Sequence, residues 1–543
     1  MNSPVPGNHT VARSLSPFHS EIGAAVLDQR VGLLEAALVE ELLDSFAGGQ
    51  LSLLVLAVGL ALSATAAVGS QPFLQSINNL TAHPRPPGHS PPAFYLGHRP
   101  NLQQAQVPWR MRHAPRPESP LDSRWLQLLS ERCADLRGGG ARFEDLYLEQ
   151  RLEVRAVTSG SELQVESCRL EGAAARWRSP SRSVLHARTG LSTSAIGELL
   201  GRQADRVALP PSRPLPVAEI DPPRQWLEWA REVACRLGPT PSIIRYLGRR
   251  AAVVRSDGWV QAASPALVRV EQSGDRPTAL LAVWGHPQLG HWLTELLEPP
   301  AAKPWEPSPG SQLPVLFSAG TAGTLMHELV GHLTESDLVA AAASPLAGMK
   351  GATITASTLN IVDDPTRVDL AGAFDHDDEG VQAQPVPLVK AGRLQGYLCD
   401  REGGRRLGDE PGRGRRTGWN RPPIARQSNL IIAPGKYLPE ELEGGLDHAL
   451  VVTRIGGASV DPVSSRTVLR VERGWEVRHG RRRRPLAPCE LTGGALEILA
   501  RIDSRIGSDP TADWRLGWCV KDGLPLATGS EAPTLLVESL EVL

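Results

Sequence analysis

The segment from Gly323 to Asp337 places three polar residues, His327, Glu328 and His332, inside an otherwise apolar stretch. The flanking apolar residues are Leu325, Met326, Leu329, Val330 and Leu333. A charged glutamate in such surroundings has a high desolvation cost unless it is paired or has a chemical task. The two histidines are five positions apart, so a regular α-helix would place them about 140° apart, too far to face one metal ion. A chain with this segment must distort the helix or leave the histidines unrelated.

A π-type bulge would bring the two histidines onto one side of the helix, and such bulges cluster at functional sites. Gly331 lies where this distortion is needed, and glycine tolerates irregular backbone. A glutamate beside histidine ligands on a helix is typical of zinc peptidases, whose usual motif is one residue shorter. Spacing alone leaves two interpretations open: a metal site, or two surface histidines with a solvated glutamate.

Composition and pattern divide the chain into four parts and predict an α+β fold. Residues 1–120 form an N-terminal extension with an apolar segment at 51–68, followed by a linker rich in proline and arginine. Residues 121–298 alternate like the strands of an antiparallel sheet and include helical patterns. Residues 299–310 are a proline-rich linker. Residues 311–543 predict a β-rich, barrel-like domain that carries one metal-binding helix.

The N-terminal extension has several interpretations. Its apolar segment of about 18 residues is near the lower limit for a membrane-spanning helix. It could anchor the chain with the C-terminal part in the cytoplasm, form a buried helix, or lie outside a natural protein that starts near Met111. The six cysteines are scattered without a CxxC pair, which favours a reduced compartment, and we expect a cytoplasmic location. The net charge of −2 gives no reason to expect a nucleic-acid partner.

Further stretches follow the helical segment in a characteristic order. They are Glu335 and Asp337, Val362–Asp364, Asp377–Val381, Gly392–Tyr397, Gly414–Arg416, Asn429, Pro434–Gly435, Gly456–Gly457, Val460–Asp461, Gly517–Gly523 and Pro533–Val542. With the HExxxH segment, these stretches resemble the TldD/PmbA family of metalloproteases, in particular its metal-bearing, TldD-type members. The resemblance extends from about Glu118 to Leu543 and rests mainly on pattern before residue 300.

The resemblance implies a zinc ion held by His327, His332 and, as a thiolate, Cys519. This donor set suits zinc, which binds nitrogen and sulfur tetrahedrally and keeps one position for water in catalytic sites. Glu328 would be the general base that accepts a proton from that water. The resemblance further implies hydrolysis of unfolded or short peptides. It also implies a partner, either a homologous subunit that lacks the metal motif or, in a homodimer, a second copy.

Two other functions stay open: a catalytically quiet regulatory subunit of a peptidase complex, and a zinc amidohydrolase that acts on a non-peptide amide. Several charged residues are candidates for the surroundings of the site or for a substrate groove, namely Asp363, Asp364, Asp377, Asp378, Glu379 and the arginines near Arg415. We favour turn residues or solvated charges for these positions. The tract Arg481–Arg484 predicts a solvated hairpin turn, and the five cysteines other than Cys519 are expected to be structural.

Overall fold

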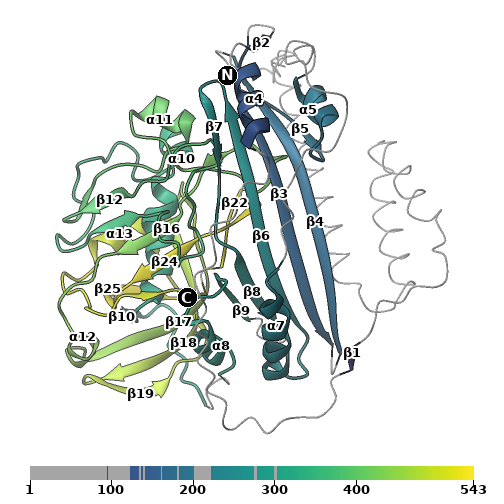
Figure 1. Ribbon diagram of the computed structural model, residues 1–543. Coiled ribbons are helices and arrows are strands. Elements are labelled where there is room, and N and C mark those ends of the chain that lie inside the picture. Colours follow the sequence, from purple (N-terminus) through teal and green to yellow (C-terminus); the bar gives the residue numbers. More distant parts are fainter. Residues whose placement is uncertain are drawn as a thin grey trace, which may run out of the picture. The chain divides into compact units, whose positions relative to one another are not determined.

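The computed structural model describes residues 94–95, 123–133, 136–138, 141–159, 162–179, 183–200, 222–273, 278–298, 303–515 and 517–543 (Figure 1). These residues belong to one compact unit, Pro92–Leu543. The apolar segment 51–68 and the proposed linker before residue 121 lie outside them. Within the described ranges, no helix is long and apolar enough to cross a membrane.

The alternating N-terminal sequence forms a nine-stranded antiparallel sheet. Six strands follow the order β1-β4-β3-β6-β8-β9, and β2, β5 and β7 pair with β3, β4 and β6 respectively. The strands are β1 (Phe94–Tyr95), β2 (Arg137–Gly138), β3 (Ala141–Ser159), β4 (Glu162–Arg178), β5 (Ser183–Thr189), β6 (Ser242–Arg255), β7 (Gly258–Gln261), β8 (Leu267–Gln272) and β9 (Thr278–Val283). Figure 1 shows the long strands β3, β4 and β6 side by side. Strand β3 is continuous, because Gln150 and Arg151 pair with both β4 and β6.

Among the described residues, four helices accompany the sheet: α4 (Ser123–Cys133), α5 (Thr193–Leu200), α7 (Arg224–Leu237) and α8 (Leu289–Leu296). Helices α7 and α8 bury tryptophans against alternate residues of β6, β8 and β9. Within this core, Trp226 meets Tyr246 at a ring-centroid distance of 6.2 Å, and Trp229 meets Trp284 at 5.4 Å, both edge to face. Such pairs add stabilisation beyond the burial of apolar area.

The C-terminal region contains a closed five-stranded barrel, because β17 pairs with both β10 and β18 in the order β17-β10-β25-β20-β18. Its strands are β10 (Gln312–Phe317), β17 (His448–Val460), β18 (Arg466–Arg478), β20 (Cys489–Gly494) and β25 (Leu535–Val542). Strand β19 (Arg481–Pro485) pairs antiparallel with the end of β18. The arginine tract is therefore the second strand of an exposed hairpin rather than its turn. The predicted α+β class, with a barrel-like sheet, is confirmed.

A second sheet, of six strands, lies beside the helix that carries the motif. Its strands are β13 (Arg393–Leu394), β12 (Val386–Lys390), β11 (Ile361–Asp363), β16 (Asn429–Ile432), β24 (Gly529–Ala532) and β21 (Thr511–Ala512). Two small hairpins, β14 (Gly414–Arg415) with β15 (Ile424–Ala425) and β22 (Trp518–Lys521) with β23 (Leu524–Ala527), lie outside these sheets. The helices are α9 (Thr321–Met326), α10 (Ser336–Ala340), α11 (Arg401–Leu407), α12 (Pro439–Gly444) and α13 (Ala495–Ala500), and α9 leads into the segment with the motif. A Cβ on Gly323 would lie 2.2 Å from Ser530 Oγ, which shows how closely α9 packs on β24.

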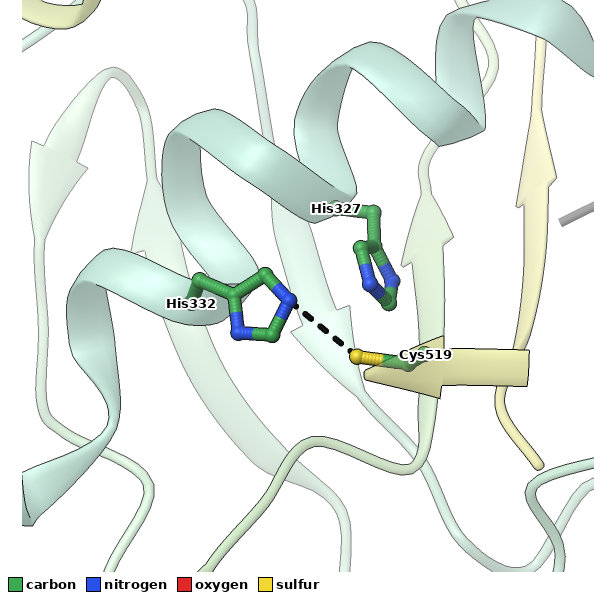
Figure 2. A group of neighbouring side chains, drawn as sticks. All are labelled: His327, His332 and Cys519. Atoms are coloured by element: carbon green, nitrogen blue, oxygen red, sulfur yellow. Dashed lines mark hydrogen bonds between the residues drawn. The ribbon is translucent and has the colours of Figure 1, made fainter. Parts of the chain in front are cut away.

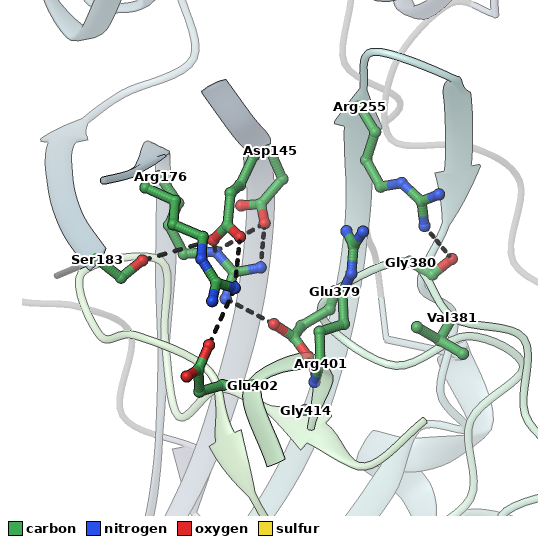
Figure 3. A network of polar contacts seen from close by, with 12 residues as sticks. Asp145, Arg176, Ser183, Arg255, Glu379, Gly380, Val381, Arg401, Glu402 and Gly414 are labelled. Atoms are coloured by element: carbon green, nitrogen blue, oxygen red, sulfur yellow. Dashed lines mark hydrogen bonds and ion pairs between the residues drawn. The ribbon is translucent and has the colours of Figure 1, made fainter. Parts of the chain in front are cut away.

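Buried ion pairs join the C-terminal region to the N-terminal sheet. Arg176 on β4 lies between Asp145 on β3 and Glu379, and its Nη1 is 2.5 Å from Glu379 Oε1 (Figure 3). Arg416 also pairs with Asp145 at 3.1 Å, and Arg249 on β6 pairs with Asp378. Glu379 and Asp145 are fully buried. The interpretation of Asp378 and Glu379 as solvated charges was therefore wrong, because tertiary contacts supply their counter-charges, whereas the alternative, that they are turn residues, is confirmed.

Of the remaining acidic candidates, two are buried and one is a turn residue. Asp377 is buried and accepts hydrogen bonds from the backbone N–H groups of Glu379, Val381 and Gly414. Buried Asp363 pairs with Arg413 at 2.5 Å. Asp364 is a turn residue, as expected, because its carboxylate accepts from the backbone and hydroxyl of Thr366.

Glu149 on β3 makes stability depend on pH. Burial raises the pKa of its carboxyl, but Arg151 and Arg249 outweigh burial and lower that pKa to about 2. Since the folded-state pKa is depressed, the stabilisation is complete above about pH 4.5 and is lost as the pH falls towards 2. We expect Glu149→Gln to lower the free energy of unfolding by about 2–3 kcal/mol at pH 7 and to lose less stability than wild type between pH 4.5 and 2.

Urea unfolding at several pH values would measure this effect. Glu153→Gln is the control, because Glu153 lies on the same strand and pairs with Arg155, whose side chain is 44% exposed. Parallel stability curves for Glu149→Gln and wild type between pH 4.5 and 2 would contradict the assignment.

Candidate metal centre

The helix that carries the two histidines is distorted where the sequence required it. Helix α9 continues as a π-helical turn, His327–Gly331, and then as a 3₁₀ turn, His332–Thr334. The backbone N–H of His332 donates to the carbonyl of His327, five residues earlier. The extra residue in this turn brings positions five apart to the same side of the helix. The predicted bulge is confirmed.

Gly331 serves this turn differently from what we expected. Its φ of −54° and ψ of −66° are open to any residue, so backbone freedom does not explain the glycine. A Cβ at this position would instead lie 2.0 Å from Gln427 Oε1. Gly331 therefore makes room for the side chain of Gln427.

Cys519 reaches the helix from strand β22. The backbone carbonyl of Cys519 accepts a hydrogen bond from Arg426 Nη2 at 2.7 Å, and Arg426 Nη1 donates to the carbonyl of Leu524 on the paired strand. Lys521, two residues further along β22, donates to Asp337 at 2.7 Å and lies 2.9 Å from Glu335 Oε2. Buried and partly buried polar contacts therefore hold this hairpin against the helix.

The three predicted metal ligands converge. His327, His332 and Cys519 each offer a ligand atom within 4.8 Å of the others, and Cys519 Sγ lies 3.1 Å from His332 Nε2 (Figure 2). The two imidazole rings are nearly perpendicular, with centroids 4.9 Å apart. Ligand atoms around a tetrahedral zinc ion lie about 3.4–3.6 Å apart. The donor set and its spacing therefore fit zinc with only small adjustments.

These side chains change one another's affinity for protons. Burial raises the pKa of the Cys519 thiol, but His327 and His332 outweigh burial and hold that pKa well below its usual value. Burial lowers the pKa of His332, but Glu335 and Cys519 outweigh it and hold that pKa well above its usual value. The site thus favours a cysteine thiolate, the form of cysteine that binds metal ions.

Glu335 orients His332. Its Oε2 lies 3.1 Å from His332 Nδ1, which leaves Nε2 directed at Cys519. Burial raises the pKa of Glu335, but His332, Lys521 and Arg426 outweigh it and lower that pKa to about 2. A carboxylate that holds the second nitrogen of a histidine is the usual support for a metal ligand.

Glu328 lies among the same groups without a partner of its own. It is 7% exposed, and within the described ranges its carboxylate makes no hydrogen bond or ion pair. Burial raises its pKa, although His327 and His332 partly oppose the shift. A carboxylate with a raised pKa and free acceptor atoms takes up a proton more readily than an ordinary glutamate.

The sequence interpretation missed three residues of this centre. Lys521 could have been found, because it alternates with Cys519 on one strand and must share its face. Arg426 and Gln427 carry no comparable signal, since they contact Cys519 and His327 from 93 and 100 residues away. Of the other cysteines, Cys133 and Cys399 are buried, Cys489 is partly buried, and Cys168 and Cys235 are exposed.

Comparison with known proteins identifies the C-terminal region. Residues 310–543 match the family described as the PmbA/TldA metallopeptidase C-terminal domain. This region belongs to the TldD/PmbA family. The match includes the helix with both histidines and the strand with Cys519, so the candidate metal centre lies wholly within the TldD/PmbA region.

Individual TldD/PmbA relatives agree with this assignment. A metalloprotease TldD homolog from Buchnera aphidicola subsp. Schizaphis graminum is 30% identical over 236 residues, which are 43% of this chain and 49% of the relative. A zinc metalloprotease TldD homolog from Saccharolobus solfataricus is 27% identical over 241 residues, which are 42% of this chain and 51% of the relative. The chain thus spans about half the length of the curated relatives that it matches.

The similarity in fold extends beyond the C-terminal region. The crystal structure of TldE from Thermococcus kodakarensis superposes with a TM-score of 0.54 at 16% identity, over 73% of this chain and 96% of that one. At this identity the comparison shows a shared fold alone. The family match begins at residue 310, so it does not test the weaker TldD/PmbA resemblance expected from residue 118 to 300.

Proposed function

We propose that this chain is a zinc metallopeptidase in which His327, His332 and Cys519 hold the zinc ion and Glu328 is the general base. The observation that supports this most directly is the meeting of Cys519 with His332 across 187 residues of sequence, at 3.1 Å. The raised pKa of His332 and the lowered pKa of Cys519 add to it, because both arise from how closely these groups lie. A zinc metalloprotease among the relatives agrees with the choice of metal.

A zinc ion held by His327, His332 and Cys519 would lower the pKa of a bound water molecule to about 7 and would polarise a substrate carbonyl. Glu328 would accept the proton from the attacking water and pass it to the leaving amine. Its unpaired carboxylate and raised pKa support this role. Glu335 and Lys521 would keep His332 and the Cys519 strand in place during turnover.

Burial of the centre limits the substrates that could reach it. His327, Glu328 and Cys519 are 2%, 7% and 5% exposed, so a folded protein surface could not approach them. We therefore propose unfolded or short peptides as substrates. A homologous subunit without the metal motif, or a second copy of this chain, would be the partner, and the likeness to TldE supports a subunit of the same fold. The cytoplasmic location stays a prediction.

Metal analysis of purified protein tests the ligand set. We expect about one zinc per chain in the wild type and loss of that zinc in His332→Ala and Cys519→Ala, because each substitution removes one of the three donors. His291→Ala and Cys235→Ala are matched controls, since both side chains are exposed and lie outside the centre. A wild type without zinc, or ligand variants that keep it, would refute the site.

A further inference from the structure

The carboxamide of Gln427 lies inside the centre and is tightly held. Gln427 is 1% exposed, its backbone N–H donates to Glu335 Oε1 at 3.2 Å, and its carbonyl accepts from Arg415 Nη1 at 2.7 Å. Its side chain fills the space over Gly331, where even a Cβ would collide with Oε1. The carboxamide is therefore confined to a position beside the π-helical turn.

The surroundings decide which end of the carboxamide faces His327. Gln427 Nε2 lies 3.3 Å from the backbone carbonyl oxygen of His327 and 3.2 Å from His327 Nε2. A carbonyl oxygen only accepts hydrogen bonds, so the atom that faces it must be the NH₂ group. The same NH₂ group faces the imidazole, so His327 Nε2 accepts from it when the neutral ring carries its proton on Nδ1. A ring with its proton on Nε2 would instead donate to the sulfur of Cys519, with which His327 also shares a hydrogen bond.

On the other side of the ring, His327 Nδ1 is buried and has no hydrogen-bond partner in the described part of the chain. A proton on Nδ1 therefore has no acceptor, and the hydrogen bond from Gln427 to Nε2 must offset that cost. With the proton on Nδ1, the lone pair of Nε2 is the only one that the neutral ring could give to a metal ion. The N–H of Gln427 is directed at this lone pair.

We propose that Gln427 caps His327 Nε2 and competes with the metal ion for it, an inference that rests on the proposed zinc site. His332 shows the contrasting arrangement, because its supporting carboxylate, Glu335, holds Nδ1 and leaves Nε2 unhindered by that support. A hydrogen-bond acceptor on the ring nitrogen away from the metal raises the basicity of the histidine and strengthens its bond to the metal. A donor on the ligand nitrogen itself weakens metal binding, because the hydrogen bond must break before the ion binds.

Gln427→Met tests the competition, since methionine has a similar length but no N–H. We expect the metal-free variant to bind Zn²⁺ and Co²⁺ roughly threefold to tenfold more tightly than wild type, the worth of one hydrogen bond, in titrations against a chromophoric chelator. Gln395→Met is the matched control, because Gln395 donates to the carbonyl of Arg393 in an exposed turn. Unchanged or weaker binding by Gln427→Met, in protein that unfolds at the wild-type urea concentration, would overturn the proposal.

A second measurement needs no substitution of Gln427. Nitrogen-15 NMR of histidine-labelled, metal-free wild type should show His327 as the Nδ1–H tautomer, with His327→Gln identifying its signals. An Nε2–H tautomer would overturn the cap. The two proposals fail separately: zinc retained by His332→Ala and Cys519→Ala refutes the zinc site, whereas a zinc-binding wild type with no gain in Gln427→Met refutes only the cap.

Discussion

Glu328→Gln is expected to lower kcat for peptide hydrolysis by about 10²–10⁴-fold while the zinc content stays at the wild-type level. Glutamine keeps the shape of the side chain but cannot accept the proton of the attacking water. None of the three proposed ligands is altered, and Glu328 has no hydrogen bond in the described structure that the substitution would break. The loss should therefore fall on the chemical step, with KM nearly unchanged.

Hydrolysis of an unfolded peptide library, followed by mass spectrometry with and without a co-purified homologous subunit, would measure this loss. Glu306→Gln, in an exposed segment before the barrel, is the control for the change in charge. Because burial raises the pKa of Glu328, wild-type activity should fall with decreasing pH at a higher pH than an ordinary glutamate would give. Full activity in Glu328→Gln would exclude the general-base role, and inactivity of the wild type even with its partner would favour a regulatory subunit.

Arg176→Met is expected to lower the free energy of unfolding by about 3–5 kcal/mol. Arg176 joins β4 to the C-terminal region through Asp145 and Glu379, both fully buried (Figure 3). Removing it leaves two buried carboxylates with fewer counter-charges, and this loss costs more than the methionine side chain regains by burial. Asp145 would keep Arg416 at 3.1 Å, so the variant should still fold.

Equilibrium unfolding in urea would measure the loss. Arg188→Met provides the comparison, because Arg188 pairs with Glu198 where both side chains are more than half exposed, and it should cost less than about 1 kcal/mol. Equal effects of the two substitutions would show that the pairs between the sheet and the C-terminal region contribute little to stability.

Local sequence rules captured the features that depend on neighbouring residues. The alternation within residues 121–298 predicted an antiparallel sheet, and the pattern of residues 311–543 predicted a barrel-like sheet. The five-residue separation of His327 and His332 predicted the π-helical turn, because a regular helix cannot place both on one side. Each of these inferences uses a period or a spacing that the chain itself carries.

Other features depend on residues far apart in the sequence. Asp378 and Glu379 were interpreted as turn residues or solvated charges, because no counter-charge lies near them in the pattern. Their partners, Arg249 and Arg176, lie on strands of the N-terminal sheet. We expected Gly331 to be needed for its tolerance of irregular backbone, whereas the structure shows that it makes room for the side chain of Gln427.

By itself, the sequence determined that the helix must be distorted if both histidines are to face one metal ion, and it predicted the α+β class and the curled C-terminal sheet. Helical and strand periods are local properties, and a few neighbouring residues suffice to specify them. Only the tertiary structure decided that Cys519 meets His332, that Glu335 and Gln427 hold different nitrogens of the two histidines, and that the acidic stretch is buried. Apart from Glu335, which is three residues from His332, the partners in those contacts lie about 100 to 200 residues apart in the sequence. Packing selects such contacts, because a buried charge or lone pair is stable only beside its partner.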